Sequence, residues 1–122
     1  MQDFKRLVVW QKSHALYLAS YRELGTGRSG HTFGLRTQLL RAAASIPANI
    51  AEGCGKPSTK EFIRFLGIAL GSARELENHL IAARDLEILE AARFDSLNSQ
   101  LVVVQRMLIA LMKSLRGQEP RA

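Results

Sequence analysis

The chain is poor in cysteine, proline and histidine, and it has no apolar run long enough for a membrane span. Its 122 residues include one cysteine, three prolines and three histidines. The lone cysteine, Cys54, excludes an intrachain disulfide and is typical of a reducing compartment. The apolar stretch at residues 7–10 ends at Gln11, whereas a signal sequence needs about 7–15 apolar residues and a span about 20. We therefore expect a cytoplasmic protein without a membrane partner.

The residue spacings of common catalytic and metal sites are also missing. There is no His-x-x-x-His pair and no Glu-x-x-His set, and the three histidines are dispersed along the chain. Residues 53–59 resemble a phosphate-binding loop at first sight. However, Pro57 follows Lys56 where that motif requires Ser or Thr. We therefore expect no enzyme activity, no metal and no cofactor.

Positive charge is what the chain has in excess, with a net charge of +6. Residues 1–57 hold eight Lys/Arg and three Asp/Glu, whereas residues 58–122 hold nine and eight. A basic excess attracts nucleic acid or other acidic partners without regard to sequence. The excess lies in the first half of the chain, and the candidate nucleic-acid contacts chosen there are Lys12, Arg22, Arg36 and Arg41.

Apolar residues recur at steps of three and four, which is the spacing of helices that bury one face. The clearest stripe is Phe94, Leu97, Leu101, Val104, Leu108, Leu111 and Leu115. The pattern predicts helices at about 8–24, 33–52, 58–86 and 92–116, a glycine-rich connection at 25–32 and a tail at 117–122. No window shows strand alternation. Four helices with short connections predict one all-α domain, an antiparallel up-down-up-down four-helix bundle.

Local signals refine two of these helices. Ser58 with Glu61 three residues later is a capping box and predicts a helix start. In the first helix, the residues Trp10, His14, Tyr17, Tyr21 and Leu24 follow one line, and we interpret this line as the packing face.

Pro47 falls inside an otherwise helical stretch, where it removes a backbone hydrogen bond at a typical cost of about 3 kcal/mol. Either the helix kinks at Pro47 to fit the curvature of the bundle, or Ser45 caps a new short helix. A kink would also present Asn49 and Glu52 on one face to a partner. Gly53 is expected to end this helix.

One face of the helix expected at 58–86 carries glycines and charges at helical spacing. Its members are Lys60, Arg64, Gly67, Gly71 and Arg74. Each interior glycine costs about 1 kcal/mol relative to alanine, so two glycines one turn apart suggest that another surface approaches closely. A subunit interface is the first explanation, contact with nucleic-acid phosphates is the second, and a tolerated solvent face is the third.

Three segments carry a family resemblance over nearly the whole chain. They are Asp3-Phe4-x-x-Leu7-x-Val9-Trp10-Gln11-Lys12, then Gln38-Leu39-x-Arg41-Ala42-Ala43-x-Ser45-Ile46-Pro47-Ala48-Asn49-Ile50-Ala51-Glu52-Gly53, and Lys60-Glu61-Phe62-x-Arg64-Phe65-Leu66-x-Ile68-Ala69-x-Gly71-Ser72-x-x-Glu75-Leu76-Glu77. Together they resemble the bacterial four-helix-bundle family first noted in intervening sequences of large-subunit ribosomal RNA genes. The motif positions present here include Pro47, Asn49, Glu52, Gly53, Gly71, Ser72 and Glu75.

The resemblance implies a closed homo-oligomer, a pentameric ring of bundles. It also implies a relationship to the accessory proteins of diversity-generating retroelements, which are basic pentamers that bind a reverse transcriptase and nucleic acid. The resemblance therefore implies the chain itself, RNA or DNA, and a reverse transcriptase as partners.

Two functional hypotheses follow. In the first, the protein is a homo-oligomeric scaffold that binds RNA or DNA through backbone charge, with strong salt dependence and without sequence specificity. In the second, it is an adaptor that docks another protein and binds no nucleic acid, so that its basic charge serves only solubility.

Overall fold

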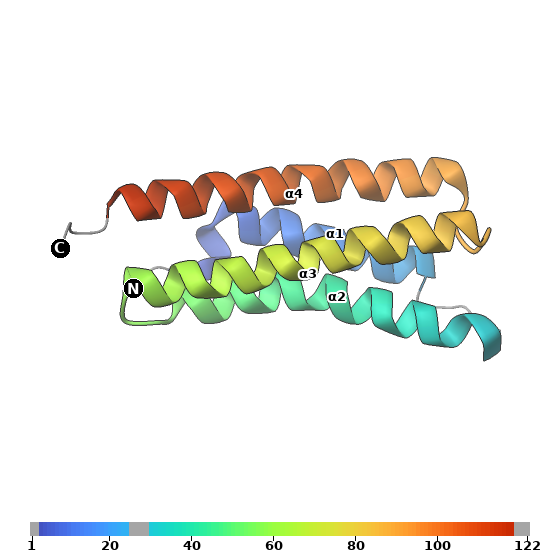
Figure 1. The fold of residues 1–122 in the computed structure, drawn as a ribbon, viewed down its shortest axis with the longest axis horizontal. Helices are drawn as coiled ribbons and strands as arrows, with labels where there is room; N and C mark the ends of the chain where they lie inside the picture. The colour runs from blue at the N-terminus through green and yellow to red at the C-terminus, as the bar shows by residue number, and fades with distance from the viewer. Residues whose placement is uncertain (1–2, 25–29, 119–122) are drawn as a thin grey trace.

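The computed structural model describes residues 3–24 and 30–118, and within them it contains four long helices and no strand (Figure 1). A 3-10 helix, η1 (Phe4–Arg6), precedes α1 (Val8–Leu24), α2 (Gly30–Cys54), α3 (Thr59–Asp85) and α4 (Ala91–Gly117). The predicted glycine-rich connection and C-terminal tail lie largely outside the described residues. The all-α class predicted from apolar periodicity is confirmed.

The four helices lie side by side along one long axis (Figure 1). Helices α1 and α3 each pack against both α2 and α4, so every helix has two neighbours. In Figure 1, α2 and α3 are joined at one end of the molecule, and α3 and α4 at the other. Each helix therefore keeps an outward face that its neighbours do not cover. None of the helices in the described ranges is long and apolar enough to cross a membrane.

The core lies along the shared axis and is built almost entirely from aliphatic side chains. The stripes expected on α3 and α4 point inward, and their most deeply buried members are Leu66, Ala69, Ala73, Leu76 and Leu80 of α3 and Leu101, Val104 and Leu108 of α4. From α2, the core receives Leu39, Ala43, Ile46 and Ile50. Because each stripe occupies one side of its helix, the four stripes can meet only in a bundle.

In α1 the buried face differs from the predicted one. The core residues of α1 are Val9, Leu16 and Leu24, with Ser13 and Ser20 fully buried between them. Of the predicted aromatic line, Leu24 lies in the core, Trp10 and Tyr17 are half-buried and pack against it, and Tyr21 is 54% exposed. Two serines can be buried because each hydroxyl donates to a carbonyl of its own helix, Ser13 to Trp10 at 2.9 Å and Ser20 to Leu16 at 2.8 Å. The aromatic line therefore forms the edge of the packing face, and the line from Val9 to Leu24 through the two serines forms its centre.

Helix α2 runs without interruption through Pro47 and extends past both predicted ends, to Gly30 and Cys54. A continuous helix means that the alternative in which Ser45 caps a new helix is wrong. The expected stop at Gly53 is also wrong, because the helix passes through this residue. Gly53 is buried where α2 packs against α3.

Helix α3 begins and ends with specific hydrogen bonds. The Ser58 hydroxyl accepts from the Glu61 amide at 3.1 Å, so the predicted cap is confirmed. At the other end, the backbone amides of Ile88 and Leu89 donate to the Ala83 carbonyl at 2.9 and 3.1 Å. Glu87 has a φ of 61°, which lets the chain reverse into α4.

Candidate nucleic-acid interface and assembly surface

The four basic residues selected from the sequence do not form one cluster. Lys12 and Arg22 lie on α1 and Arg41 on α2, all exposed and without an ion pair to any described residue. Arg36 differs, because its side chain is half-buried and its guanidinium donates within the chain. Three of the four residues are therefore available to a partner, from two different helices.

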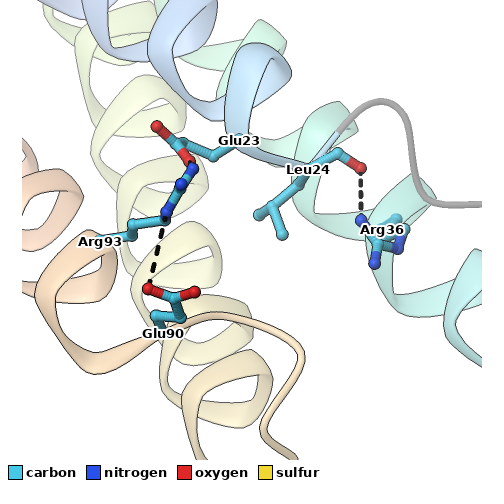
Figure 2. A network of polar contacts seen from close by, with 5 residues as sticks. All are labelled: Glu23, Leu24, Arg36, Glu90 and Arg93. Carbon is cyan, nitrogen blue, oxygen red and sulfur yellow. Dashed lines mark hydrogen bonds and ion pairs between the residues drawn. The ribbon is translucent and has the colours of Figure 1, made fainter.

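Arg36 ties α2 to the end of α1. Its Nη1 donates to the Leu24 carbonyl at 2.9 Å (Figure 2). Its Nε donates to the Thr32 hydroxyl at 3.2 Å. The Leu24 carbonyl belongs to the last residue of α1, where helix carbonyls lack partners within the helix. A cation at this place also suits the negative end of the helix dipole. Arg36 is thus a capping residue for α1.

A second arginine holds the same end of α1 from the other side. Arg93 of α4 forms ion pairs with Glu23 of α1 and Glu90, and Figure 2 shows it between these two carboxylates. The hydrogen bond from Arg93 to Glu23 raises the pKa of Arg93, and the charges of Glu23 and Glu90 raise it further. Arg93 is therefore occupied within the chain rather than available to a partner.

We expect an Arg36→Gln variant to lose about 1 kcal/mol of unfolding free energy, because the Leu24 carbonyl loses its charged donor. Arg41→Gln is the matched control, since it removes the same charge from the same helix at an exposed position. It should change stability by less than about 0.5 kcal/mol. Urea unfolding followed by helical circular dichroism measures both variants. Equal losses in the two variants would contradict the capping role.

Helix α4 carries basic residues that the sequence analysis missed. Residues 91–117 hold four Lys/Arg and one Asp/Glu, whereas residues 58–90 hold four and six. The second half of the chain has almost no net charge because the acidic excess of residues 58–90 offsets the basic excess of α4. Arg106, Lys113 and Arg116 are exposed and form no ion pair within the described part of the chain.

The arginines of α3, in contrast, are occupied by neighbouring groups. They pair with carboxylates as Arg64–Glu61 at 3.2 Å, Arg74–Glu77 at 3.7 Å and Arg84–Asp85 at 3.0 Å. The guanidinium groups of Arg64 and Arg84 also stack on the rings of Phe65 and Phe94, at 4.6 and 4.5 Å. Lys60 is the one described Lys or Arg of α3 that is exposed without an ion pair, so the cations available to an acidic partner lie mainly on α1 and α4.

A groove lies between α1 and α4 beside some of these cations. It encloses about 320 Å³ and is lined by Lys12 and Ala15 of α1 and by Ser99, Gln100 and Val103 of α4. Its walls are mainly apolar, and Lys12 is the only charged residue in the lining. It is thus an apolar depression with one cation on a basic side of the bundle.

The face selected on α3 as a subunit interface contains two glycines in different surroundings. A Cβ at Gly71 would meet no atom within 4 Å, so nothing described in the chain requires glycine there. A Cβ at Gly67 would lie 3.7 Å from Met112 of α4, which is an ordinary contact. Lys60, Arg64 and Arg74 are exposed around them. Gly71 is therefore the residue of this face whose identity the fold leaves unexplained.

Next to Gly71, three polar side chains join α2 to α3. The hydroxyls of Ser45 and Ser72 form a hydrogen bond at 2.8 Å. Asn49 donates its amide to the Ser45 carbonyl and hydroxyl, at 2.8 and 2.9 Å. Asn49 thus supports this contact, whereas Glu52 is exposed. Ser45 and Asn49 of α2 thus meet Ser72 of α3, although the sequence separates them.

Of the remaining motif residues, Gly53 permits close helix packing. A Cβ at Gly53 would lie 2.6 Å from the Cβ of Phe65 and 3.1 Å from Cδ1 of Phe62. Real Cβ atoms do not approach so closely, so only glycine fits at this crossing of α2 and α3. Pro47 is buried nearby in α2.

Histidine and cysteine side chains are scattered in the described structure. The His14 ring stacks on Trp10 with centroids 4.8 Å apart, and His79 contacts Glu75 at 3.3 Å. Cys54 is buried at the end of α2. In the described ranges no group of three or more His, Cys, Asp or Glu residues could hold a metal ion.

In its described residues the chain is thus all-α, with four long helices, and its net charge is +6. Comparison with known proteins identifies its family. The family model described as 23S rRNA-intervening sequence protein matches residues 5–110. The chain therefore belongs to this family, and the resemblance seen in the sequence is confirmed.

A solved structure extends the comparison to three dimensions. The chain is similar to a protein of unknown function from the S23 ribosomal protein family of Bacteroides thetaiotaomicron, with 30% sequence identity and a TM-score of 0.79. The similarity covers 87% of this chain and 99% of that chain. No curated protein sequence matches significantly.

Proposed function

We propose that the protein is a non-enzymatic, homo-oligomeric scaffold that binds RNA or DNA through backbone charge, without sequence specificity. The observation that carries this proposal is the set of exposed cations without an ion pair in the described structure. Its members are Arg6 of η1, Lys12 and Arg22 of α1, Arg41 of α2, Lys60 of α3, and Arg106, Lys113 and Arg116 of α4. Phosphates are the partners that such a surface attracts most strongly.

The proposal does not include base-specific recognition. Sequence readout in duplex DNA needs an element that enters a groove and places several side chains on base edges. The basic residues of this chain are spread over all four helices and are separated by exposed apolar residues such as Leu18 and Ile109. We therefore expect affinity to depend on salt far more than on sequence.

Self-assembly is the second part of the proposal, and the α2–α3 side of the bundle supports it. An exposed glycine in a helix interior destabilises the helix by about 1 kcal/mol relative to alanine. No described atom lies close enough to Gly71 to require glycine there. A second copy packed closely over Gly71 and the Ser45–Ser72 contact would explain it. We further propose that the bundle has up-down-up-down order and assembles as a pentameric ring. Five copies would carry a net charge of about +30, since each carries +6.

The name of the family adds indirect support for RNA as the nucleic acid. The matching model describes a 23S rRNA-intervening sequence protein, and the structural relative is assigned to the S23 ribosomal protein family. We therefore take structured RNA as the first ligand to test.

A protein adaptor is the second candidate, and one observation favours it. Large apolar side chains are exposed on α1 and α2, including Tyr21 at 54% and Phe33 at 64%. Exposed aromatic residues are enriched in protein interfaces. A protein partner, for example a reverse transcriptase, could dock on these residues whether or not nucleic acid is bound.

Light-scattering mass of the purified protein, with and without a structured RNA, tests the proposal. We expect a mass of about 68 kDa without RNA, five times the 13.6 kDa of the chain. RNA should raise this mass at about 50 mM salt, and the complex should dissociate at about 300 mM salt. A Gly71→Arg variant should have a lower mass, because the arginine would separate the two copies.

Each part of the proposal can fail separately. A ring whose mass does not change with RNA at low salt would overturn nucleic-acid binding and favour the protein adaptor. A monomer in the absence of RNA would overturn assembly and leave Gly71 without an explanation. RNA binding that is equally tight at low and high salt would contradict the backbone-charge mechanism.

A further inference from the structure

The groove between α1 and α4 is short. On α4 its lining residues are Ser99, Gln100 and Val103, and on α1 they are Lys12 and Ala15, so it covers about one turn of each helix. A docking helix would need an apolar groove several turns long, because its anchors recur at i, i+3, i+4 and i+7. At about 320 Å³, the groove instead has the size of a small-molecule pocket.

The chemistry of the groove combines apolar walls with a few polar groups. Ala15 and Val103 provide apolar surface, and the Gln100 amide can both donate and accept hydrogen bonds. The Ser99 hydroxyl donates to the Asp95 carbonyl at 2.8 Å, which leaves its lone pairs as acceptors. Lys12 adds one positive charge. A flat group with apolar faces, a polar edge and a negative charge next to it would match all of these features.

Further cations flank the groove at both ends. Glu23 of α1 contacts Arg93 of α4, whereas Lys12 and Ala15 lie beside residues 99–103. Residue numbers therefore increase in opposite directions along the two helices, which are antiparallel. Arg22 follows Ala15 by seven residues and Arg106 follows Ser99 by seven. Seven residues are two helical turns, or about 10 Å along the axis. Arg22 and Arg106 therefore lie beyond opposite ends of the groove, with Lys12 between them.

A single-stranded nucleic acid has the chemistry that this arrangement would recognise. Its phosphates can follow a line of cations, and an unpaired base presents apolar faces and a polar edge that a duplex hides. We propose that the α1–α4 groove binds one unpaired base of an RNA or DNA strand, with Lys12, Arg22 and Arg106 on the adjacent phosphates. Val103 and Ala15 pack on the base, and the Gln100 amide bonds to its edge. This inference rests on the nucleic-acid binding proposed above and names its substrate class, single-stranded segments.

Abasic strands separate base binding from phosphate binding. We would measure binding by fluorescence anisotropy, using a labelled oligothymidine and a strand of the same length whose central residues lack bases. The wild-type protein should bind the complete strand about 3- to 10-fold more tightly, which is below the usual gain from aromatic stacking because no aromatic residue lines the groove.

The Ala15→Leu variant fills the groove without changing charge or helix propensity much. It should bind the complete strand as weakly as the abasic strand, while its affinity for the abasic strand equals that of the wild type. Ala110→Leu is the matched control, because Ala110 is exposed on α4 and does not line the groove. It should behave as the wild type, and circular dichroism should show that both variants fold.

Two results would overturn the inference while leaving the proposed function intact. The first is equal binding of complete and abasic strands by the wild-type protein. The second is an Ala15→Leu variant that still prefers the complete strand, in which case another surface holds the bases. If neither strand binds to the wild-type protein at low salt, the proposed nucleic-acid function itself fails, and the groove proposal fails with it.

Discussion

We expect a Gly53→Ala variant to be less stable than the wild-type chain by about 1–3 kcal/mol, although alanine is normally the better helix former. The added Cβ would lie 2.6 Å from the Cβ of Phe65 and 3.1 Å from Cδ1 of Phe62. A Cβ is fixed to the backbone and cannot rotate away, so α2 and α3 must separate to admit it. Urea unfolding followed by circular dichroism measures the loss.

The matched control for this variant is Gly34→Ala in the same helix. A Cβ at Gly34 would meet no atom within 4 Å. Alanine at this position should therefore stabilise the chain, by up to about 1 kcal/mol. The same substitution in one helix is thus expected to have opposite effects at two positions. If both variants were stabilised, the close approach of α2 to α3 at Gly53 would not be a constraint on the fold.

The second large effect is expected on nucleic-acid binding when the unpaired cations of α4 are removed. A variant with Arg106, Lys113 and Arg116 all replaced by Gln should bind RNA about 10- to 100-fold more weakly at about 100 mM salt. The slope of log affinity against log salt should decrease in magnitude by about 2–3, since each of the three lost phosphate contacts contributes about 0.7–0.9. Filter binding or anisotropy over a salt series measures both quantities.

A matched triple variant of α3 tests whether location or total charge matters. Replacing Arg64, Arg74 and Arg84 by Gln also lowers the net charge by three. Arg64 and Arg74 lie on the face proposed for assembly, so light scattering must first show that this variant keeps the wild-type mass. These arginines already form ion pairs with Glu61, Glu77 and Asp85, so they should contribute little to phosphate binding. Exposed ion pairs of this kind are worth about 0–1 kcal/mol, so the variant should still fold. Equal losses of affinity in both triple variants would show that only net charge matters and would contradict a binding surface on α4.

Much of the fold can be predicted from local features of the sequence. The stripes from Leu66 to Leu80 and from Leu101 to Leu108 repeat at helical spacing, and their residues are buried. Ser58 caps α3 because the capping group and the amide it accepts from are only three residues apart. The family motif is also a string of neighbouring residues, so its match over residues 5–110 needed no structure.

Other features depend on contacts between distant residues and were missed or misjudged. The aromatic line of α1 was predicted as the core face in place of the face with Ser13 and Ser20. Hydropathy counts serine as polar, although a serine hydroxyl can form its hydrogen bond within its own helix and then be buried. Gly53 was interpreted as the end of a helix. Glycine is in fact required there because Phe65 of α3 leaves no room for a Cβ, and the sequence does not show this contact. Arg36 was interpreted as a surface cation. Its acceptor, the Leu24 carbonyl, is twelve residues away, so the spacing along the chain does not reveal the hydrogen bond.

The sequence by itself determined the four helices, their apolar stripes, the family and the positive net charge, because each of these follows from residue type and from spacing along the chain. Only the tertiary structure decided which cations remain without partners, which glycine is enclosed and which is open, and where α1 and α4 leave a groove. These properties depend mainly on which helix lies next to which and in what register. The ion pairs of the α3 arginines are the exception, because both partners lie on one helix.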